Sequence, residues 1–175
     1  MELPMTRKPV LCCTIILTLA SLAFAVVKPD FNGSWVMDRG RSFGLPANMQ
    51  SSMTVKQTAD QIDVETKLIQ PENERTIKDT YVLDGKEYDF SPPVPPTVPA
   101  DAPKPKGKRT ATWLPKGDGI MVTEVTTTET PKGPATTQVV KKWTFTAEGE
   151  ITIAYYVDGP NGSYEAKRIF TKKAN

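Results

Sequence analysis

Apolar and polar residues alternate along most of the chain, and this period of two predicts β-strands with one buried face. The clearest case is the segment 61–69, where Ile62, Val64 and Leu68 fall on one face and Asp63 falls on the other. A strand of this kind is typical of an antiparallel sheet that packs one face on a core and exposes the other to water.

Similar segments recur at short intervals until the end of the chain. Residues that favour turns, such as Gly, Asn, Asp and Pro, separate most of them, so we expect hairpin connections. No segment has the period of a long helix. The predicted strands are a first strand within 30–40, followed by 51–57, 61–69, 76–83, 86–90, 109–114, 119–128, 136–146, 151–157 and 163–173.

This succession predicts an all-β fold, an antiparallel up-and-down meander of about 8–10 strands that closes into a barrel and so hides its sheet edges. Asp84-Gly85 predicts a tight hairpin into the strand 86–90. The segment 91–108 carries seven prolines and breaks the pattern. Because proline excludes both helix and central strand, we expect a stiff, extended surface loop near a rim of the barrel.

The first predicted strand opens with FNGSW at 31–35, and the last one contains an in-phase arginine. Gly33 would let the backbone bend or pack closely, and Trp35 would then point inward behind Phe31. Arg168 shares its strand face with apolar residues, so its charge requires a partner. The indole face of Trp35 is the expected one. The apolar residues in phase with Arg168 are Tyr164, Ala166 and Phe170.

This motif, the in-phase arginine and the strand meander together resemble the calycins, the superfamily of lipocalins and fatty-acid-binding proteins. The resemblance implies a lipocalin-like barrel whose base is closed by Phe31, Gly33, Trp35 and Arg168, and whose interior holds one small apolar or amphipathic ligand. Fatty-acid-binding proteins hold a carboxylate through a terminal Arg-x-Tyr. Here the corresponding residues are Arg168 and Phe170, so the hydroxyl of that motif is missing.

The first 25 residues have the features of a secretory signal peptide. Arg7 and Lys8 precede an apolar run, and AFA at 23–25 is a small-x-small cleavage site. We therefore expect cleavage after Ala25 and a periplasmic or extracellular domain of residues 26–175, the alternative being an uncleaved membrane anchor. Both cysteines of the chain fall within the signal, so the mature domain would have no disulfide.

Composition narrows the chemistry further. The chain has no histidine, which removes the Ser-His-Asp triad, the Cys-His pair and the ordinary zinc site. Its 22 basic and 20 acidic residues include Arg7, Lys8 and Glu2 of the signal, which leaves 20 and 19 in the mature domain. This balance does not indicate nucleic-acid binding. We expect a monomer with no cofactor, no metal, no catalytic residue and no enzymatic activity.

Apolar residues predicted to face the barrel interior are the candidate ligand site. Periodicity alone leaves two interpretations open, a hollow barrel that binds a small molecule and a filled core of close-packed side chains. The first predicts a ligand-binding protein. The alternative predicts an envelope interaction protein or inhibitor that acts through its surface. The candidate interior residues are Tyr81, Trp113, Met121, Trp143, Tyr155 and Phe170.

Overall fold

The computed structural model describes residues 28–71, 73–93, 104–130 and 133–173 of the chain. The predicted signal peptide, residues 1–25, and residues 94–103 of the predicted proline-rich loop lie outside these ranges. Among the described residues, no helix is long and apolar enough to cross a membrane. The regular structure that they form is β-strand.

Ten strands follow one another in the described part of the chain, and each begins and ends within about three residues of a predicted strand. The alternation of apolar and polar residues therefore located these elements well. The first five strands are β1 (Gly33–Met37), β2 (Gln50–Gln57), β3 (Gln61–Gln70), β4 (Asn73–Val82) and β5 (Asp84–Phe90). The remaining five are β6 (Lys106–Trp113), β7 (Gly119–Thr130), β8 (Gly133–Phe145), β9 (Ile151–Gly159) and β10 (Gly162–Lys172).

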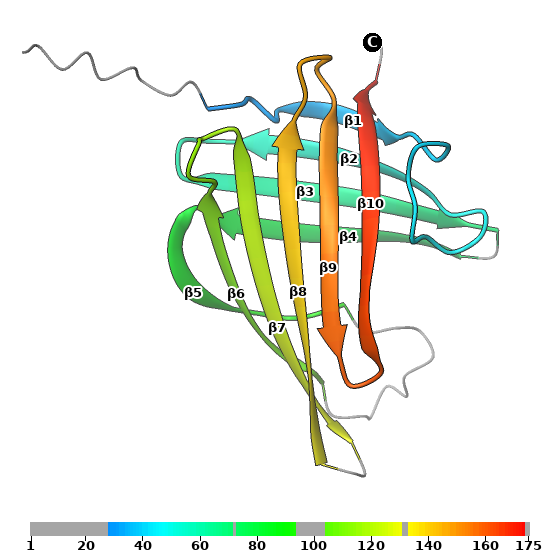
Figure 1. The fold of residues 1–175 in the computed structure, drawn as a ribbon, viewed down its shortest axis with the longest axis vertical. Helices are drawn as coiled ribbons and strands as arrows, with labels where there is room; N and C mark the ends of the chain where they lie inside the picture. The colour runs from blue at the N-terminus through cyan, green and yellow to red at the C-terminus, as the bar shows by residue number, and fades with distance from the viewer. Residues whose placement is uncertain (1–27, 72, 94–103, 131–132, 174–175) are drawn as a thin grey trace, which may run out of the picture.

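All ten strands form one antiparallel sheet in the order β4-β3-β2-β1-β10-β9-β8-β7-β6-β5. The first and last strands pair, with Trp35 opposite Lys172 and Met37 opposite Phe170. Figure 1 shows that β1–β4 cross the strands β7–β10, so the sheet folds over on itself as two layers. The predicted all-β meander is confirmed, as a ten-stranded sheet nearly closed into a barrel.

The sheet stays open at one seam, between β4 and β5. The hairpin predicted at Asp84-Gly85 was wrong, because β4 and β5 are the two ends of the strand order and do not pair. Leu83 is buried, and its backbone N–H donates to the carbonyl of Asp60 at 2.8 Å, which fixes the end of β4. The Asp84 carboxylate accepts the N–H of Lys86 at 2.9 Å in a local turn. This turn redirects the chain into the other layer instead of folding it back.

The predicted proline-rich loop also ends earlier than expected. β6 begins at Lys106, so the last three residues of the predicted loop 91–108 belong to a strand. Lys106 and Lys108 are exposed, whereas Gly107 is buried. A Cβ at Gly107 would collide with the ring of Phe90 in the neighbouring strand β5. A glycine here therefore lets two strands beside the seam approach closely.

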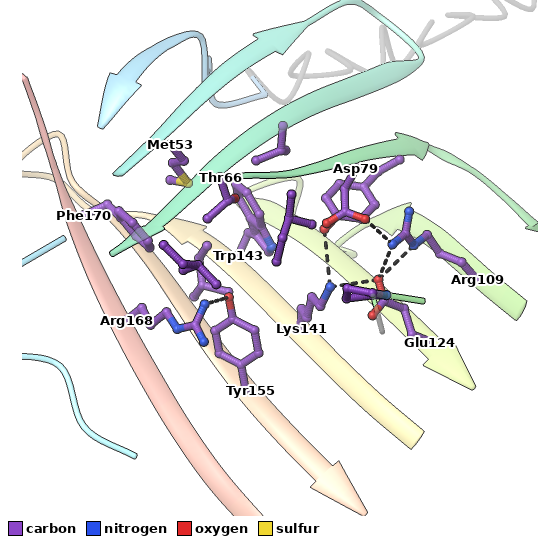
Figure 2. Close-up of a pocket in the computed structure, with 16 residues that line it drawn as sticks. Met53, Thr66, Asp79, Arg109, Glu124, Lys141, Trp143, Tyr155, Arg168 and Phe170 are labelled. Carbon is purple, nitrogen blue, oxygen red and sulfur yellow. Dashed lines mark hydrogen bonds and ion pairs between the residues drawn. The ribbon is translucent and has the colours of Figure 1, made fainter. Parts of the chain in front are cut away.

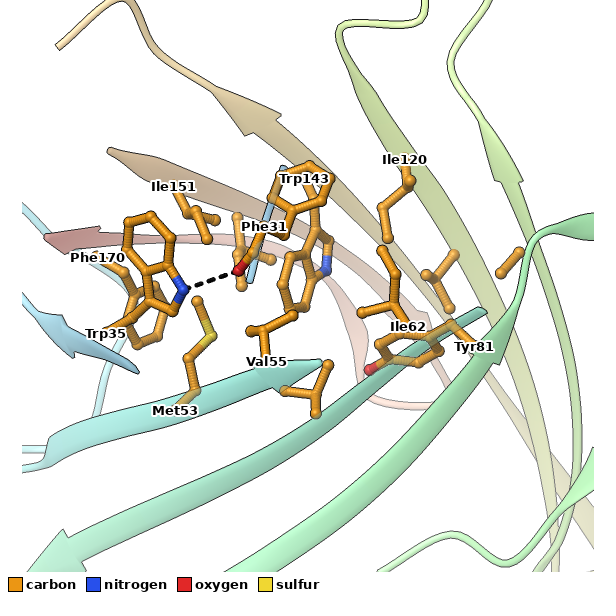
Figure 3. Packing of buried hydrophobic residues seen from close by; sticks show 14 of the residues in the cluster. Phe31, Trp35, Met53, Val55, Ile62, Tyr81, Ile120, Trp143, Ile151 and Phe170 are labelled. Carbon is orange, nitrogen blue, oxygen red and sulfur yellow. Dashed lines mark hydrogen bonds between the residues drawn. The ribbon is translucent and has the colours of Figure 1, made fainter. Parts of the chain in front are cut away.

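Aromatic side chains fill one end of the barrel, as Figure 3 shows. Phe31 packs edge-on against Trp143 with ring centroids 6.0 Å apart, and Trp35 packs in the same way against Phe145 at 6.0 Å. The indole N–H of Trp35 donates to the carbonyl of Phe31 at 3.0 Å. The buried indole therefore has a partner for its polar group, and this end of the barrel is a packed core.

The opening motif behaves as predicted, except in its basic partner. Gly33 has φ of +131°, and a Cβ there would lie 3.1 Å from the Cε of Lys172. The ammonium of Lys172 lies 5.6 Å from the ring centroid of Trp35. The predicted stacking of Arg168 on Trp35 was wrong, because the β1–β10 register places Lys172 opposite Trp35 and the guanidinium of Arg168 lies over Tyr155.

Candidate functional site

An internal cavity of about 130 Å³ lies between the two layers (Figure 2). Its apolar wall includes Met53, Ile153 and Phe170. The volume is close to that of an engineered cavity of about 150 Å³ that binds benzene, and it is below the roughly 300 Å³ at which drug-sized sites begin. The polar part of the wall brings together five charged side chains, Asp79, Arg109, Glu124, Lys141 and Arg168.

Four of these charges form one network inside the barrel. The Arg109 guanidinium donates from Nε to Glu124 at 2.8 Å and from Nη2 to Asp79 at 2.5 Å. The ammonium of Lys141 donates to the same Glu124 oxygen at 2.8 Å. Two cations and two carboxylates therefore balance one another. A buried charge is tolerated only with such partners, so this network is a built feature of the interior.

The network also closes the seam that the backbone leaves open. Arg109 belongs to β6, yet its Nη1 donates to the carbonyl of Thr80 in β4 at 3.2 Å. Its guanidinium carbon lies 4.2 Å from the ring centroid of Phe90, in the intervening strand β5. The side chain of Arg109 thus contacts both edge strands, β4 and β5, and donates a hydrogen bond to a carbonyl of β4.

Tyr81 lies beside the network and contacts both of its cations. The Arg109 guanidinium carbon is 4.8 Å from the Tyr81 ring centroid, and Lys141 donates to the phenol oxygen at 3.4 Å. Burial raises the pKa of Tyr81 well above its ordinary value, so the phenol is neutral at physiological pH. Burial opposes the charge of Lys141, but the phenol of Tyr81 and the carboxylate of Glu124 outweigh it and raise the pKa of Lys141.

Among the described residues that line the cavity, Arg168 is the one cation outside this balance. Its Nη1 donates to the hydroxyl of Tyr155 at 3.2 Å, and its guanidinium carbon lies 4.5 Å from that ring centroid. Within the described residues it forms no ion pair with a carboxylate, and its buried Nε has no hydrogen-bond partner there. The indole Nε1 of Trp143, also in the cavity wall, is likewise buried without a partner among the described residues. These are unmet hydrogen-bond donors in a site that has room for a ligand.

The structure places the six predicted interior residues in three kinds of position. Four line the cavity, namely Tyr81, Trp143, Tyr155 and Phe170. Trp113 packs on the edge of the core outside the cavity, with the Lys28 ammonium 4.5 Å from its ring centroid. The placement of Met121 inside the barrel was wrong. Its side chain is 40% exposed, because Ile120 and Val122 take the inward positions of β7 and leave Met121 facing out.

Sequence reasoning did not identify the four charges of the network as a site. Each of them nevertheless occupies the inward phase of its strand, with Asp79 two residues before Tyr81 and Lys141 two residues before Trp143. A charged residue in phase with buried apolar ones is a signal that the sequence does contain. It marks an inward charge but does not identify its partner, because Asp79 and Glu124 come from opposite layers of the barrel.

The described residues contain no group of three or more His, Cys, Asp or Glu placed to hold a metal ion. Within the described residues, the site offers an apolar wall, two unmet donors and one uncompensated cation. No protein-family model matches the chain, and the search of curated proteins finds no significant match.

Proposed function

We propose that this barrel binds a small amphipathic molecule in its interior. The observation that carries the proposal is the pair of unpartnered buried donors, Trp143 Nε1 and Arg168 Nε, on residues that line a cavity. A buried donor without an acceptor costs about 1–3 kcal/mol, so a ligand that supplies an acceptor there gains more than one that only fills space. Met53, Ile153 and Phe170 would contact its apolar part.

The size of the cavity limits the ligand. A volume of about 130 Å³ suits a compound near benzene in size, with one hydrogen-bond acceptor, rather than a long-chain fatty acid. The hydroxyl that the Arg168-x-Phe170 sequence lacks is supplied beside Arg168 by Tyr155 of the neighbouring strand. We propose binding without catalysis, by a protein that is exported on the signal-like segment 1–25.

The small volume also favours a second candidate function, that of a filled barrel acting through its surface. Most of the inward side chains pack against one another in a single cluster. A protein of this kind would bind an envelope or extracellular partner and no small molecule. The two functions differ in whether the interior accepts a ligand, and one experiment separates them.

That experiment measures the melting temperature of the domain of residues 26–175 with cyclohexanone and with cyclohexane. We expect cyclohexanone, which offers a carbonyl acceptor, to stabilise the native protein more than cyclohexane does. Trp143→Phe removes one donor and should reduce this difference. Trp113→Phe is the matched control, because Trp113 lies outside the cavity, and it should leave the difference unchanged. If neither compound stabilises the native protein, the interior does not bind ligands and the surface function is favoured.

A further inference from the structure

A second pocket, of about 160 Å³, lies at the mouth of the barrel and shares Arg168 with the internal cavity. The loop that joins β1 to β2 forms one wall through Pro46 and Met49. The polar side chains that line the pocket within the described residues are two arginines and two amides, and none of those described residues carries a carboxylate. These four side chains are Gln70, Asn73, Arg75 and Arg168.

The position of Arg75 in β4 explains why it faces this pocket. Arg75 pairs with Leu68 of β3 and shares its strand face with Asp79 and Tyr81, whose side chains lie inside the barrel. Its neighbour Glu74 takes the opposite face, where it pairs with Lys67 at 2.8 Å. Within the described part of the chain, Arg75 forms no ion pair, so its charge is available at the mouth.

Arg168 adds a second uncompensated charge. Figure 2 shows its guanidinium against the Tyr155 ring, with one nitrogen bonded to the hydroxyl. That bond uses Nη1, which leaves Nη2 without an acceptor among the described residues, while the buried Nε is the donor proposed above for the interior ligand. An Nη group of a guanidinium donates strong, charge-assisted hydrogen bonds to oxyanions. Two like charges repel in one pocket, and a bound anion would relieve that repulsion.

The pocket is held in shape by contacts at its loop wall. The hydroxyl of Ser42 donates to the carbonyl of Asp38 at 2.6 Å and accepts the N–H of Ile169 at 3.0 Å, which fastens the loop to β10. Arg41 bonds the carboxylate of Glu150 through both Nη atoms. Gly44 has φ of +68°, and a Cβ there would lie 2.7 Å from that of Ala166. A ligand at this mouth therefore meets a preformed wall.

We propose that the mouth pocket binds a phosphate-class oxyanion between Arg75 and Arg168, with Gln70 and Asn73 as amide donors. The volume of about 160 Å³ exceeds that of the internal cavity and has room for the five heavy atoms of phosphate or sulfate. A doubly charged oxyanion balances the charge of two guanidinium groups and accepts the hydrogen bonds that they donate. The site does not rest on the proposed interior ligand, because phosphate can bind while the internal cavity is empty.

The oxyanion could be free or part of a larger molecule. Arg168 and Leu68 belong to the walls of both pockets, so a phosphate monoester could place its anion at the mouth and a short alkyl group toward the interior. Inorganic phosphate, n-butyl phosphate and n-butanol distinguish these sources. Equal affinity for the two phosphates indicates a free oxyanion, whereas tighter binding of the ester indicates an organic phosphate.

The test is isothermal titration calorimetry of residues 26–175 at pH 8 and constant ionic strength, with inorganic phosphate as the first ligand. We expect Arg75→Gln to weaken phosphate binding by about tenfold or more, since charge-assisted hydrogen bonds are lost. Lys78→Gln is the matched control, because it removes one positive charge from the same strand. Lys78 lies on the outer face, where it pairs with Glu65. This control should bind phosphate as the native protein does.

Each outcome decides the proposal. Loss of phosphate binding in Arg75→Gln alone supports the mouth site. Equal weakening in Arg75→Gln and Lys78→Gln, or no phosphate binding by the native protein, overturns it. Binding of n-butanol or cyclohexanone reports on the interior cavity separately, and Arg75→Gln should not change it. Failure of the mouth site and failure of the proposed interior function are therefore distinguishable.

Discussion

Tyr81 shows how a single buried residue joins the apolar and the charged halves of the barrel interior. One side of its ring packs against Trp143, with centroids 6.1 Å apart, and the cations of Arg109 and Lys141 lie near the ring as well. Its hydroxyl accepts a hydrogen bond from Lys141. An ionised phenol at this position would lose its solvation, so burial raises the pKa of Tyr81 above the ordinary value of 10.0.

This environment predicts a late titration of Tyr81. The pKa of Tyr88 is raised as well, by its hydrogen bond to the Asp84 carboxylate. We expect Tyr81 to stay protonated above pH 10 until the barrel opens, and ultraviolet absorbance of tyrosinate during an alkaline titration measures this. Tyr81→Phe should remove the late transition. A late transition that persists in Tyr81→Phe would contradict the assignment.

The same shifts determine how stability depends on alkaline pH. The pKa values of Tyr81 and Lys141 are both raised in the folded state above their ordinary values of 10.0 and 10.5. The unfolded chain therefore releases these two protons first as pH rises, and their contribution to stability is intact below about pH 10 and falls above it. Thermal melts between pH 7 and 11 should show the corresponding decline.

At the scale of the residue, the sequence predicted which way most side chains point but not which residues they contact. Strand phase predicted the inward positions of Tyr81, Trp143, Tyr155 and Phe170, but in β7 it selected Met121 where the structure buries its neighbours. Partners depend on register between strands far apart in the chain. Lys172 and not Arg168 lies over Trp35 for this reason, and no local pattern encodes such a register.

At the scale of the element, the seam between β4 and β5 is the weak point of the sheet. Every other strand is hydrogen-bonded along both edges, whereas each of these two has only one neighbour. Arg109 supplies a side-chain connection in place of the missing backbone ladder, through Asp79 and the carbonyl of Thr80. Local opening of the barrel should therefore begin here.

Hydrogen exchange measured by mass spectrometry tests this expectation. Peptides from β4 and β5 should exchange faster than peptides from β9, which is paired on both sides. Arg109→Met leaves Asp79 without its cation and should speed exchange at the seam by about tenfold or more, since breaking a buried pair costs about 3–5 kcal/mol.

Lys108→Met is the control for that variant, because Lys108 lies in the same strand but forms only exposed pairs with Glu87 and Asp89. It should leave exchange at the seam unchanged. Uniform protection of all ten strands, unaltered by Arg109→Met, would show that the seam is no weaker than the rest of the sheet.

The elements themselves were predictable because alternation and turn residues are local signals, whereas the pairing at Asp84-Gly85 was not. The turn chemistry there is real, since the Asp84 carboxylate caps the N–H of Lys86. The burial of Leu83 decides that the chain turns a corner. A hairpin and a corner share the same turn residues, so the choice between them depends on packing beyond the turn.

At the scale of the whole molecule, the barrel depends on a short junction between its first and last strands. β1 pairs with β10 at only three positions, yet this pairing joins β2–β4 to the other strands of the sheet. The N–H of Lys173 extends the junction by donating to the carbonyl of Ser34 at 2.8 Å. The last residues of β10 should therefore contribute more to stability than their exposure suggests.

A chain that ends at Phe170 tests this junction against a control that ends at Lys173. The shorter chain loses the pairing partners of Val36 and Trp35 as well as the Lys172 ammonium over the indole. Two or three backbone hydrogen bonds and one cation–π contact amount to about 3 kcal/mol, which corresponds to a fall of about 10 °C in melting temperature. Tryptophan emission should also shift to the red as Trp35 gains solvent. The control should match the full-length domain, and equal melting temperatures for the two truncated chains would mean that the packed aromatic core alone holds the layers together.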